Sequence, residues 1–299
     1  MSDRRFSLGL IGHPLEHSLS PQLHRAALQD HCLEGDYLLY DIPPLPAGWA
    51  QLDAIFNKMR CGEIQGLNVT IPHKQTVIPF LDKLTPVANA VGAVNTIVPG
   101  ENGLVGDNTD VKGFMADLQR QVPDRSLMDQ KKDRAALVLG AGGAARAVVY
   151  ALASSGWTVR LAARRLEQAE SLIGDLSRNS GDQVLVITTI SYEQNAIQNA
   201  VFDCQLIVNT TPVGMFPNIT ANPWPASMPY PKNAFIYDLV YNPAETSLIR
   251  EARLAGLQSV SGAGMLVEQA ALAFETWTGR PAPKEKMLAV LATSMRKMP

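Results

Sequence analysis

The 299-residue sequence has few cysteines and no long apolar run. Cys32, Cys61 and Cys204 are far apart and include no Cys-x-x-Cys pair, which argues against a disulfide framework or a zinc site. We therefore expect a reduced, cytoplasmic protein. No apolar stretch approaches the length of a membrane span, and only a short one precedes Gly12, so we expect neither a transmembrane helix nor a signal peptide.

The sequence also lacks a large excess of basic or acidic residues. The chain has 26 basic and 28 acidic residues, a formal net charge of −2, with no run of five like charges. We therefore expect neither nucleic acid nor a membrane as a partner. The expected assembly is a monomer or homodimer. The five histidines lie in the first quarter, with no carboxylate or cysteine completing a metal-binding set, so no metal is expected.

The length favours two domains, and each half alternates strand and helix patterns. In the first half we predict strands over 6–12, 37–43 and 66–72, a helix with Ser20 as N-cap and Gly35 as its stop, a helix over 45–59, and a hairpin over 95–108. A polar connection follows at 128–135. In the second half we predict strands at 158–164, 183–190, 205–212 and 235–241, and helices at 246–256, 264–279 and 283–297.

The second series opens on a glycine turn. Gly140, Gly142 and Ala145 have the G-x-G-x-x-A spacing, directly after the apolar run Ala-Ala-Leu-Val-Leu and directly before a helical pattern. The first glycine permits a tight turn, the second lets the backbone approach a pyrophosphate, and the small third residue lets the helix lie close to the strand. The spacing alone is weak, because a glycine-rich loop can join any strand to a helix. Its strand-turn-helix context favours a dinucleotide site.

The end of the next strand indicates which dinucleotide. An NAD enzyme usually has Asp or Glu there to hold the ribose hydroxyls, but this chain has Ala163, Arg164 and Arg165, and Glu167 is the first carboxylate. Guanidinium groups match phosphate geometry, so the pattern favours NADP, with Arg164 the stronger candidate. The alternative is that both arginines are solvated at the start of a surface helix.

The segment Leu-Asn-Val-Thr-Ile-Pro-His-Lys (67–74) begins as a buried strand, breaks at Pro72 and then presents Lys74. A lysine there is most often solvated. However, reduction of a ketone by hydride needs a proton donor at the developing alkoxide, and the reverse reaction needs a base. Lysine can serve when an aspartate orients it, and Asp107 and Asp110 stand where the chain leaves its first half.

Together these segments resemble the motif series of the shikimate dehydrogenase family, in order and approximate spacing from residue 9 to about 280. The matching motifs are GHPLEHSLSP (12–21), LNVTIPHK (67–74), GAVNT (92–96), GDNTD (106–110), GAGGAARA (140–147), NTTPVGM (209–215), DLVYNPAET (238–246) and GAGMLVEQAALAFETWTG (262–279). The resemblance implies reversible NADP-dependent reduction of 3-dehydroshikimate to shikimate, a step toward chorismate and the aromatic amino acids.

The resemblance also implies roles by position. Lys74 and Asp110 form the catalytic pair. Substrate contacts are implied for Ser18, Ser20, Thr70, Asn95, Tyr241 and Gln269. Cofactor contacts are implied for Gly140, Ala141, Gly142, Gly143, Ala144, Ala163, Arg164, Arg165, Thr210, Val240, Gly262 and Met265. Taken alone, Ser20 reads as a helix cap, Gln269 as a polar helix position and Met265 as a core methionine.

The implied fold has two α/β domains separated by a cleft. An N-terminal substrate domain with a mostly parallel sheet covers 1–109 and is completed by helices at 250–299, and a Rossmann-like NADP-binding domain covers 110–249.

The sequence departs from the family pattern at three places and leaves alternatives open. Val111 replaces a glycine after Asp110, Ala163-Arg164-Arg165 replaces Asn-Arg-Thr, and His13 stands where Asn is common. One rival is a quinate/shikimate dehydrogenase using NAD or NADP, against which Thr70 and the absent ribose-binding acid argue. Others are a non-catalytic, ligand-sensing member and an NADP-binding protein with another substrate.

Overall fold

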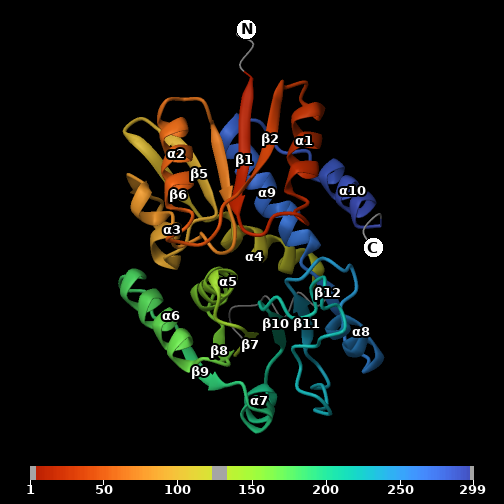
Figure 1. The fold of residues 1–299 in the computed structure, drawn as a ribbon. Coiled ribbons are helices and arrows are strands. Elements are labelled where there is room, and N and C mark those ends of the chain that lie inside the picture. Colours follow the sequence, from red (N-terminus) through yellow and green to blue (C-terminus); the bar gives the residue numbers. More distant parts are fainter. Residues whose placement is uncertain (1–4, 123–132, 297–299) are drawn as a thin grey trace. The chain divides into compact units, whose positions relative to one another are not determined.

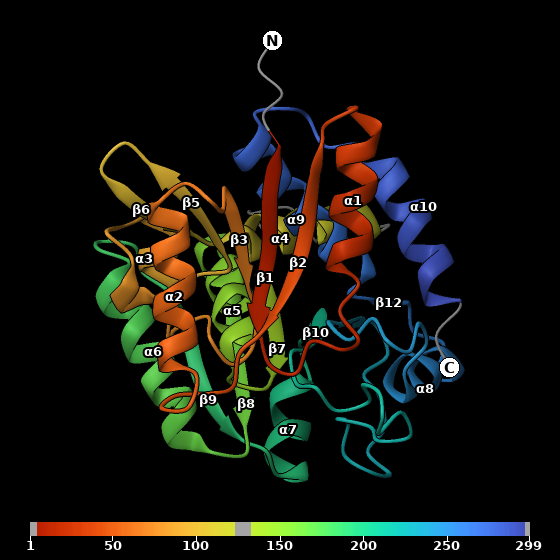
Figure 2. The same ribbon diagram turned by 45° about the horizontal axis from the view of Figure 1, so that its top comes forward.

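The computed structural model describes residues 5–122 and 133–296 and divides into two compact units (Figures 1 and 2). The first unit comprises Met1–Asp110 and Val267–Pro299, and the second comprises Val111–Leu266. The chain passes between them within α4 (Thr109–Gln121) and α9 (Ala263–Thr278). Residues 128–132 of the expected polar connection lie outside the described residues.

The first unit contains a six-stranded mixed sheet. Its order is β2 (Gly35–Asp41), β1 (Phe6–Gly12), β3 (Gly66–Val69), β5 (Thr96–Gly100), β6 (Gly103–Asp107) and β4 (Lys83–Leu84). β1 pairs in parallel with β2 and β3, and β4 with β6, whereas β5 is antiparallel to β3 and β6. The predicted hairpin over 95–108 is therefore present as β5 and β6.

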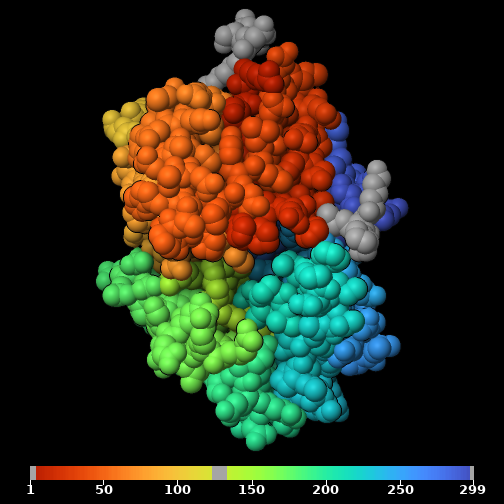
Figure 3. Space-filling view, viewed as in Figure 1, coloured from red at the N-terminus to blue at the C-terminus, as the bar shows by residue number. Residues whose placement is uncertain are grey.

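Side chains alternate between the two faces of the sheet along β3, and both faces are buried there. Leu67 and Val69 join the apolar core that includes α2 (Trp49–Arg60). Gly66 lies on the opposite face, where a Cβ atom would come within 2.5 Å of the Trp277 ring in α9. Figures 1 and 2 show α2 and α9 on opposite faces of the sheet. The space-filling view in Figure 3 shows the blue C-terminal helix α10 (Lys284–Met295) beside the red N-terminal part of this unit.

The first helix differs from its prediction at both ends. Ser20 is the first residue of α1 (Ser20–Asp30), and Leu19 occupies the N-cap position, so the prediction of Ser20 as N-cap was wrong. The Ser18 hydroxyl accepts a hydrogen bond from the Ser20 amide at 3.4 Å instead. Gly35 does not stop the helix either, because it opens β2 after a turn in which Cys32 has φ 52°.

The patterns did not predict α4, which has 13 residues, and they also missed short elements of the first unit. α3 (Pro86–Val91) begins where the Thr85 hydroxyl accepts a hydrogen bond from the Ala88 amide at 3.2 Å, and it ends at Gly92 with φ 65°. A 3₁₀ turn covers Ile78–Phe80. These elements are too short to show a hydrophobic period.

The second unit contains a parallel six-stranded sheet. Its order is β12 (Ser259–Ser261), β11 (Phe235–Asp238), β10 (Leu206–Asn209), β7 (Ala135–Leu139), β8 (Thr158–Ala163) and β9 (Ile187–Ser191). Its helices are α5 (Gly143–Ser154), α6 (Leu166–Asn179), α7 (Gln194–Val201) and α8 (Ser247–Leu254). Counted within the unit, this is the Rossmann order, and the order reverses between β7 and β10. Ligands bind such sheets outside the carboxyl ends of the strands at that point.

Two predicted boundaries moved. Residues 250–266, which we expected to complete the substrate domain, lie in the second unit, because β12 pairs with β11. β9 begins at Ile187 rather than 183, and Val184 is 84% exposed, so the start of that apolar run is not a buried strand. Within the described part of the chain, no helix has both the length and the apolar character needed to span a membrane.

A buried histidine makes the stability of the first unit sensitive to acid. His24 is stacked on Tyr37 with ring centroids 4.4 Å apart, and neither ring nitrogen has a hydrogen-bond partner among the described residues. Burial lowers the pKa of His24 from 6.5 to about 3. The unfolded chain therefore binds a proton that the folded chain does not, and stability falls as pH drops from 6.5 toward 3.

We expect His24→Phe to remove this acid sensitivity. At pH 4 the native protein should have lost about 3 kcal/mol relative to pH 7 from this group alone, and the variant should not have lost it. Urea unfolding of both proteins at the two pH values measures the difference. An equal loss in both proteins would show that His24 does not carry the effect.

Candidate active site

The topology of the first unit collects polar residues at one edge of its sheet. β1 and β3 are parallel, so the segments that carry Ser18 and Thr70 follow their carboxyl ends at the same edge. β5 runs antiparallel to β3, so Asn95, just before β5, lies at that edge too. β6 returns antiparallel to β5 and delivers Asp110 at the start of α4.

Lys74 and Asp110 form a largely buried ion pair. The Lys74 Nζ donates to Asp110 Oδ2 at 2.6 Å, and the two side chains are 13% and 7% exposed. The turn that carries Lys74 is fixed by a hydrogen bond from the His73 amide to the Thr70 carbonyl at 2.9 Å. The Val94 amide donates to the Lys74 carbonyl at 2.7 Å. Two segments 36 residues apart thus meet in one charge-assisted contact.

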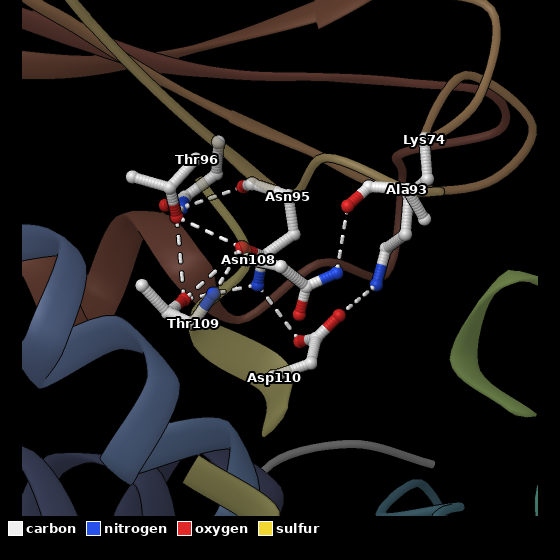
Figure 4. A network of polar contacts seen from close by, with 8 residues as sticks. Lys74, Ala93, Asn95, Thr96, Asn108, Thr109 and Asp110 are labelled. Atoms are coloured by element: carbon white, nitrogen blue, oxygen red, sulfur yellow. Dashed lines mark hydrogen bonds and ion pairs between the residues drawn. The ribbon is translucent and has the colours of Figure 1, made fainter. Parts of the chain in front are cut away.

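Asn95 fixes the other oxygen of Asp110 (Figure 4). Its Nδ2 donates to Asp110 Oδ1 at 2.8 Å, and its Oδ1 accepts from the Thr109 amide at 2.7 Å. A backbone N–H can only donate, so this second contact decides which end of the Asn95 amide faces the carboxylate. Asp110 is therefore held from both sides, by a cation and by an amide.

Two threonines and a second asparagine extend the network, and sequence reasoning assigned them no role. The Thr96 hydroxyl donates to Asn95 Oδ1 at 3.0 Å and lies 3.2 Å from the Thr109 hydroxyl. The Asn68 Nδ2 donates to Thr96 Oγ1 at 3.2 Å. All three residues lie inside quoted motifs, but only their contacts reveal what they do.

This arrangement suits proton transfer at one atom. The Lys74 ammonium has three N–H groups, and one of them is taken by Asp110. A partly buried ammonium held in one orientation can donate a proton to a developing oxyanion, or take one from a hydroxyl when neutral. The solvated lysine considered from the sequence is not what the structure shows.

The remaining substrate candidates of this unit lie on separate elements. Ser18 is half-buried in the turn before α1, and Ser20 is buried at its start. The Thr70 side-chain methyl packs so closely on Gly12 that a Cβ there would clash with it. Gln269 is half-buried on α9.

The glycine turn of the second unit has the predicted form. Gly140 has φ 103°, and a Cβ there would lie 2.7 Å from the Thr211 methyl group, so the position requires glycine. A Cβ on Gly142 would meet no atom within 4 Å. Gly142 is the N-cap of α5 and makes no side-chain cap, so its side chain does not cover the amides that open the helix.

The arginines after β8 differ in their surroundings. Arg164 is exposed and makes no hydrogen bond or ion pair with any described residue. Arg165 is the N-cap residue of α6, and its Nη2 donates to Gln168 at 2.7 Å. The uncommitted guanidinium of Arg164 fits an anionic group better than that of Arg165. Ala163, which ends β8, is buried.

The segments after β10, β11 and β12 hold the other cofactor candidates and the substrate candidate Tyr241. The Thr210 hydroxyl donates to the Leu139 carbonyl at 2.7 Å, directly before the glycine turn. Gly262 donates its amide to the Val240 carbonyl at 3.3 Å. Met265 is buried in the first turn of α9. Burial raises the pKa of Tyr241 above its ordinary value, so the phenol is a neutral donor.

Comparison with known proteins identifies the family. A model described as the shikimate dehydrogenase substrate binding domain matches residues 10–97, and one described as the shikimate 5'-dehydrogenase C-terminal domain matches 262–292. The NADP(+) shikimate dehydrogenase of Salinibacter ruber is 43% identical over 278 residues, covering 92% of this chain and 93% of that protein. This chain belongs to the shikimate dehydrogenase family.

Solved structures of family members agree with the fold. A shikimate dehydrogenase crystallised with NADP+ has a TM-score of 0.85 and 32% identity, covering 99% of this chain and 97% of that one. The enzyme from Thermus thermophilus, crystallised with NADP(H) and shikimate, has a TM-score of 0.79 and 34% identity, covering 97% and 99%. The resemblance and fold class predicted from the motifs are confirmed.

The departures from the family pattern are accommodated locally. Val111 is buried in the first turn of α4, where a helical conformation needs no glycine. His13 Nδ1 lies 2.7 Å from an Asp41 carboxylate oxygen in an exposed pair. Replacement of the family Asn-Arg-Thr by Ala163, Arg164 and Arg165 retains the middle arginine.

Proposed function

We propose that this protein catalyses the reversible NADPH-dependent reduction of 3-dehydroshikimate to shikimate, an oxidoreductase reaction at a CH–OH group. The observation that carries the proposal is the Lys74–Asp110 pair held by Asn95, in a chain of the shikimate dehydrogenase family. The reaction is a step of the shikimate pathway, which leads to chorismate and the aromatic amino acids.

Lys74 is the proton-transfer residue in this proposal. In the reductive direction its ammonium donates a proton to the oxygen of the reacting carbonyl, and in the oxidative direction the neutral amine accepts one from the hydroxyl. Asp110 Oδ2 accepts a hydrogen bond from Lys74 and holds its Nζ in place. Asn95 prevents the carboxylate from turning away, because it binds the other oxygen.

The substrate carboxylate is assigned to Ser18 and Ser20. Their hydroxyls can donate to a carboxylate without a formal cation, and the start of α1 adds a positive dipole end. Thr70, Asn95, Tyr241 and Gln269 are assigned to the substrate hydroxyls or the pocket walls.

The second unit fits an NADP cofactor. Bound there, NADPH supplies the hydride. The open space beside Gly142 and the uncapped start of α5 suit a pyrophosphate, with Ala141, Gly143 and Ala144 adjoining. Arg164, beside Ala163 and Arg165, is assigned to the 2′-phosphate. Thr210, Val240, Gly262 and Met265 are assigned to the rest of the cofactor.

Initial rates with shikimate or quinate, each with NADP or NAD, test this proposal against its closest rival. We expect shikimate with NADP to give the highest kcat/KM. Preference for quinate with NAD would assign the chain to the quinate branch of the family, and no turnover with any of the four combinations would contradict the enzyme assignment.

A methyl group at Gly142 should weaken the cofactor site without disturbing the fold. The position has φ −85°, and a Cβ would meet no protein atom within 4 Å. We expect Gly142→Ala to raise KM for NADP by about tenfold, because the methyl group occupies space reserved for the pyrophosphate. The control is Gly174→Ala in α6, where a Cβ also meets nothing within 4 Å. Equal KM values in the two variants would contradict the assignment.

We also propose where the protein is located and how it assembles. Cys32, Cys61 and Cys204 are all free thiols, which suits a reducing cytoplasm. We propose a monomer or homodimer with a small-molecule substrate, to be measured by light scattering on the purified protein.

A further inference from the structure

Two motifs of the second unit contain residues to which the reaction assigns no role. Asn209 opens the motif NTTPVGM, and Asp238 and Thr246 open and close DLVYNPAET. All three side chains have 0% exposure. They also contact one another, although the two motifs are about thirty residues apart.

Asp238 accepts three hydrogen bonds at the carboxyl end of β11. Its Oδ1 accepts from Asn209 Nδ2 at 2.8 Å and from the Val240 amide at 3.0 Å. Its Oδ2 accepts from the Thr246 hydroxyl at 2.6 Å, at the start of α8. One oxygen therefore serves the loops after β10 and β11, and the other serves α8.

Asn209 continues this connection toward the glycine turn. Its Oδ1 accepts from the Thr211 amide at 3.0 Å and from the Thr211 hydroxyl at 2.7 Å. The backbone donor fixes the amide so that Nδ2 faces Asp238. The neighbouring Thr210 hydroxyl donates to the Leu139 carbonyl at 2.7 Å, directly before Gly140. The contacts thus link the carboxyl ends of β11, β10 and β7, and the strand order reverses between the last two.

We propose that Asp238 and Asn209 are positioning residues for the nucleotide site, which hold the loops carrying Thr210 and Val240 in the arrangement that NADP binding requires. The inference rests on the proposed NADP-dependent function. Neither side chain reaches a solvent-exposed surface, so both act through the two loops.

The ionisation of Asp238 decides which substitution leaves the fold intact. Burial raises the pKa of Asp238 to about 6, although the hydrogen bonds from Thr246, Val240 and Asn209 oppose the shift. The folded protein then binds a proton more tightly than the unfolded chain, so this group stabilises the fold as pH falls through about 6 and costs stability above it. The neutral, isosteric Asp238→Asn change should therefore not destabilise the protein at pH 8.

The test compares variants on the two sides of Asp238. Asn209→Ala and Asp238→Ala break the loop connection. Thr246→Val removes the contact of Asp238 with α8 and the N-cap hydrogen bond from the Ile249 amide, and leaves the two loops joined. We expect the two alanine variants to raise Kd and KM for NADP by about tenfold and to leave KM for shikimate within about twofold. Asp238→Asn keeps an acceptor oxygen and should restore Kd to within about threefold of native. Thr246→Val should lower Tm and leave Kd for NADP within about threefold of native.

Thr211→Val keeps the inference testable if the alanine variants do not fold. Thr211 is half-buried in the loop, and its hydroxyl donates to Asn209. Loss of that donor should raise Kd for NADP by about threefold or more. Native-like NADP binding by Thr211→Val or by folded Asn209→Ala would overturn this inference and leave the proposed function standing. A rise in KM for shikimate as large as the rise in KM for NADP would do the same. Failure of the native protein to bind NADP in titration calorimetry would overturn the proposed function itself.

Discussion

Replacement of Lys74 by methionine is expected to lower kcat for shikimate oxidation by about a hundredfold or more, because the reacting oxygen loses its proton-transfer group. Methionine keeps much of the apolar stem and removes the ammonium that donates to Asp110 at 2.6 Å. KM for NADP should change little, since the cofactor candidates lie in the second unit. Steady-state kinetics at saturating shikimate and NADP measure the effect.

Two further variants separate this role from a loss of folding. Lys112→Met changes an exposed lysine two residues beyond Asp110 and should leave kcat near native. Asp110→Asn should also lower kcat strongly, because the amide no longer orients the ammonium by charge. Removal of one partner of a buried ion pair destabilises a protein, so thermal unfolding of each variant must be recorded. A folded Lys74→Met protein with near-native kcat would move proton transfer to another residue.

Arg164→Ala is expected to raise KM for NADP by about tenfold or more and to leave KM for NAD almost unchanged. A charge-assisted contact to phosphate contributes roughly 1.5–3 kcal/mol, and only NADP carries a 2′-phosphate. Arg164 is exposed and makes no hydrogen bond or ion pair within the described part of the chain, so its removal should not affect folding. Parallel kinetics with the two cofactors measure the change in preference.

The control for this variant is Arg178→Ala at the far end of α6. Arg178 is exposed and paired with Asp175, and its replacement removes the same charge at the opposite end of the helix that follows Arg164. It should alter neither cofactor constant. Arg164→Lys keeps the charge without the planar fork and should fall between alanine and native. Equal effects of Arg164→Ala on NADP and NAD would contradict phosphate recognition.

Local signals in the sequence predicted much of the architecture. The glycine turn was recognisable because Gly140 and Gly142 follow a run of five apolar residues and precede a helical pattern, and the structure has β7, the turn and α5 in that order. The hairpin of β5 and β6 was recognisable from Gly100 and Gly103. These features depend on residues close together in the chain.

The organisation of the catalytic pair could not be predicted in the same way. The orientation of Asn95 depends on the Thr109 amide, and the position of Asp110 depends on β5 and β6 reversing at the correct edge of the sheet. Such contacts join residues that are far apart in the chain or have no distinctive pattern. Ser20 shows a different limit: it is a plausible N-cap by residue type but lies one position inside α1, because residue type alone does not fix a helix end to one residue.

Supplying the purified protein with 3-dehydroshikimate and NADPH tests the central claim most directly. The decrease in absorbance of the reduced cofactor is followed while the product is separated by chromatography. We predict one shikimate formed for each NADPH oxidised, at a rate that Lys74→Met lowers by about a hundredfold or more. NADPH oxidation without shikimate, or no oxidation by a folded protein, would contradict the account.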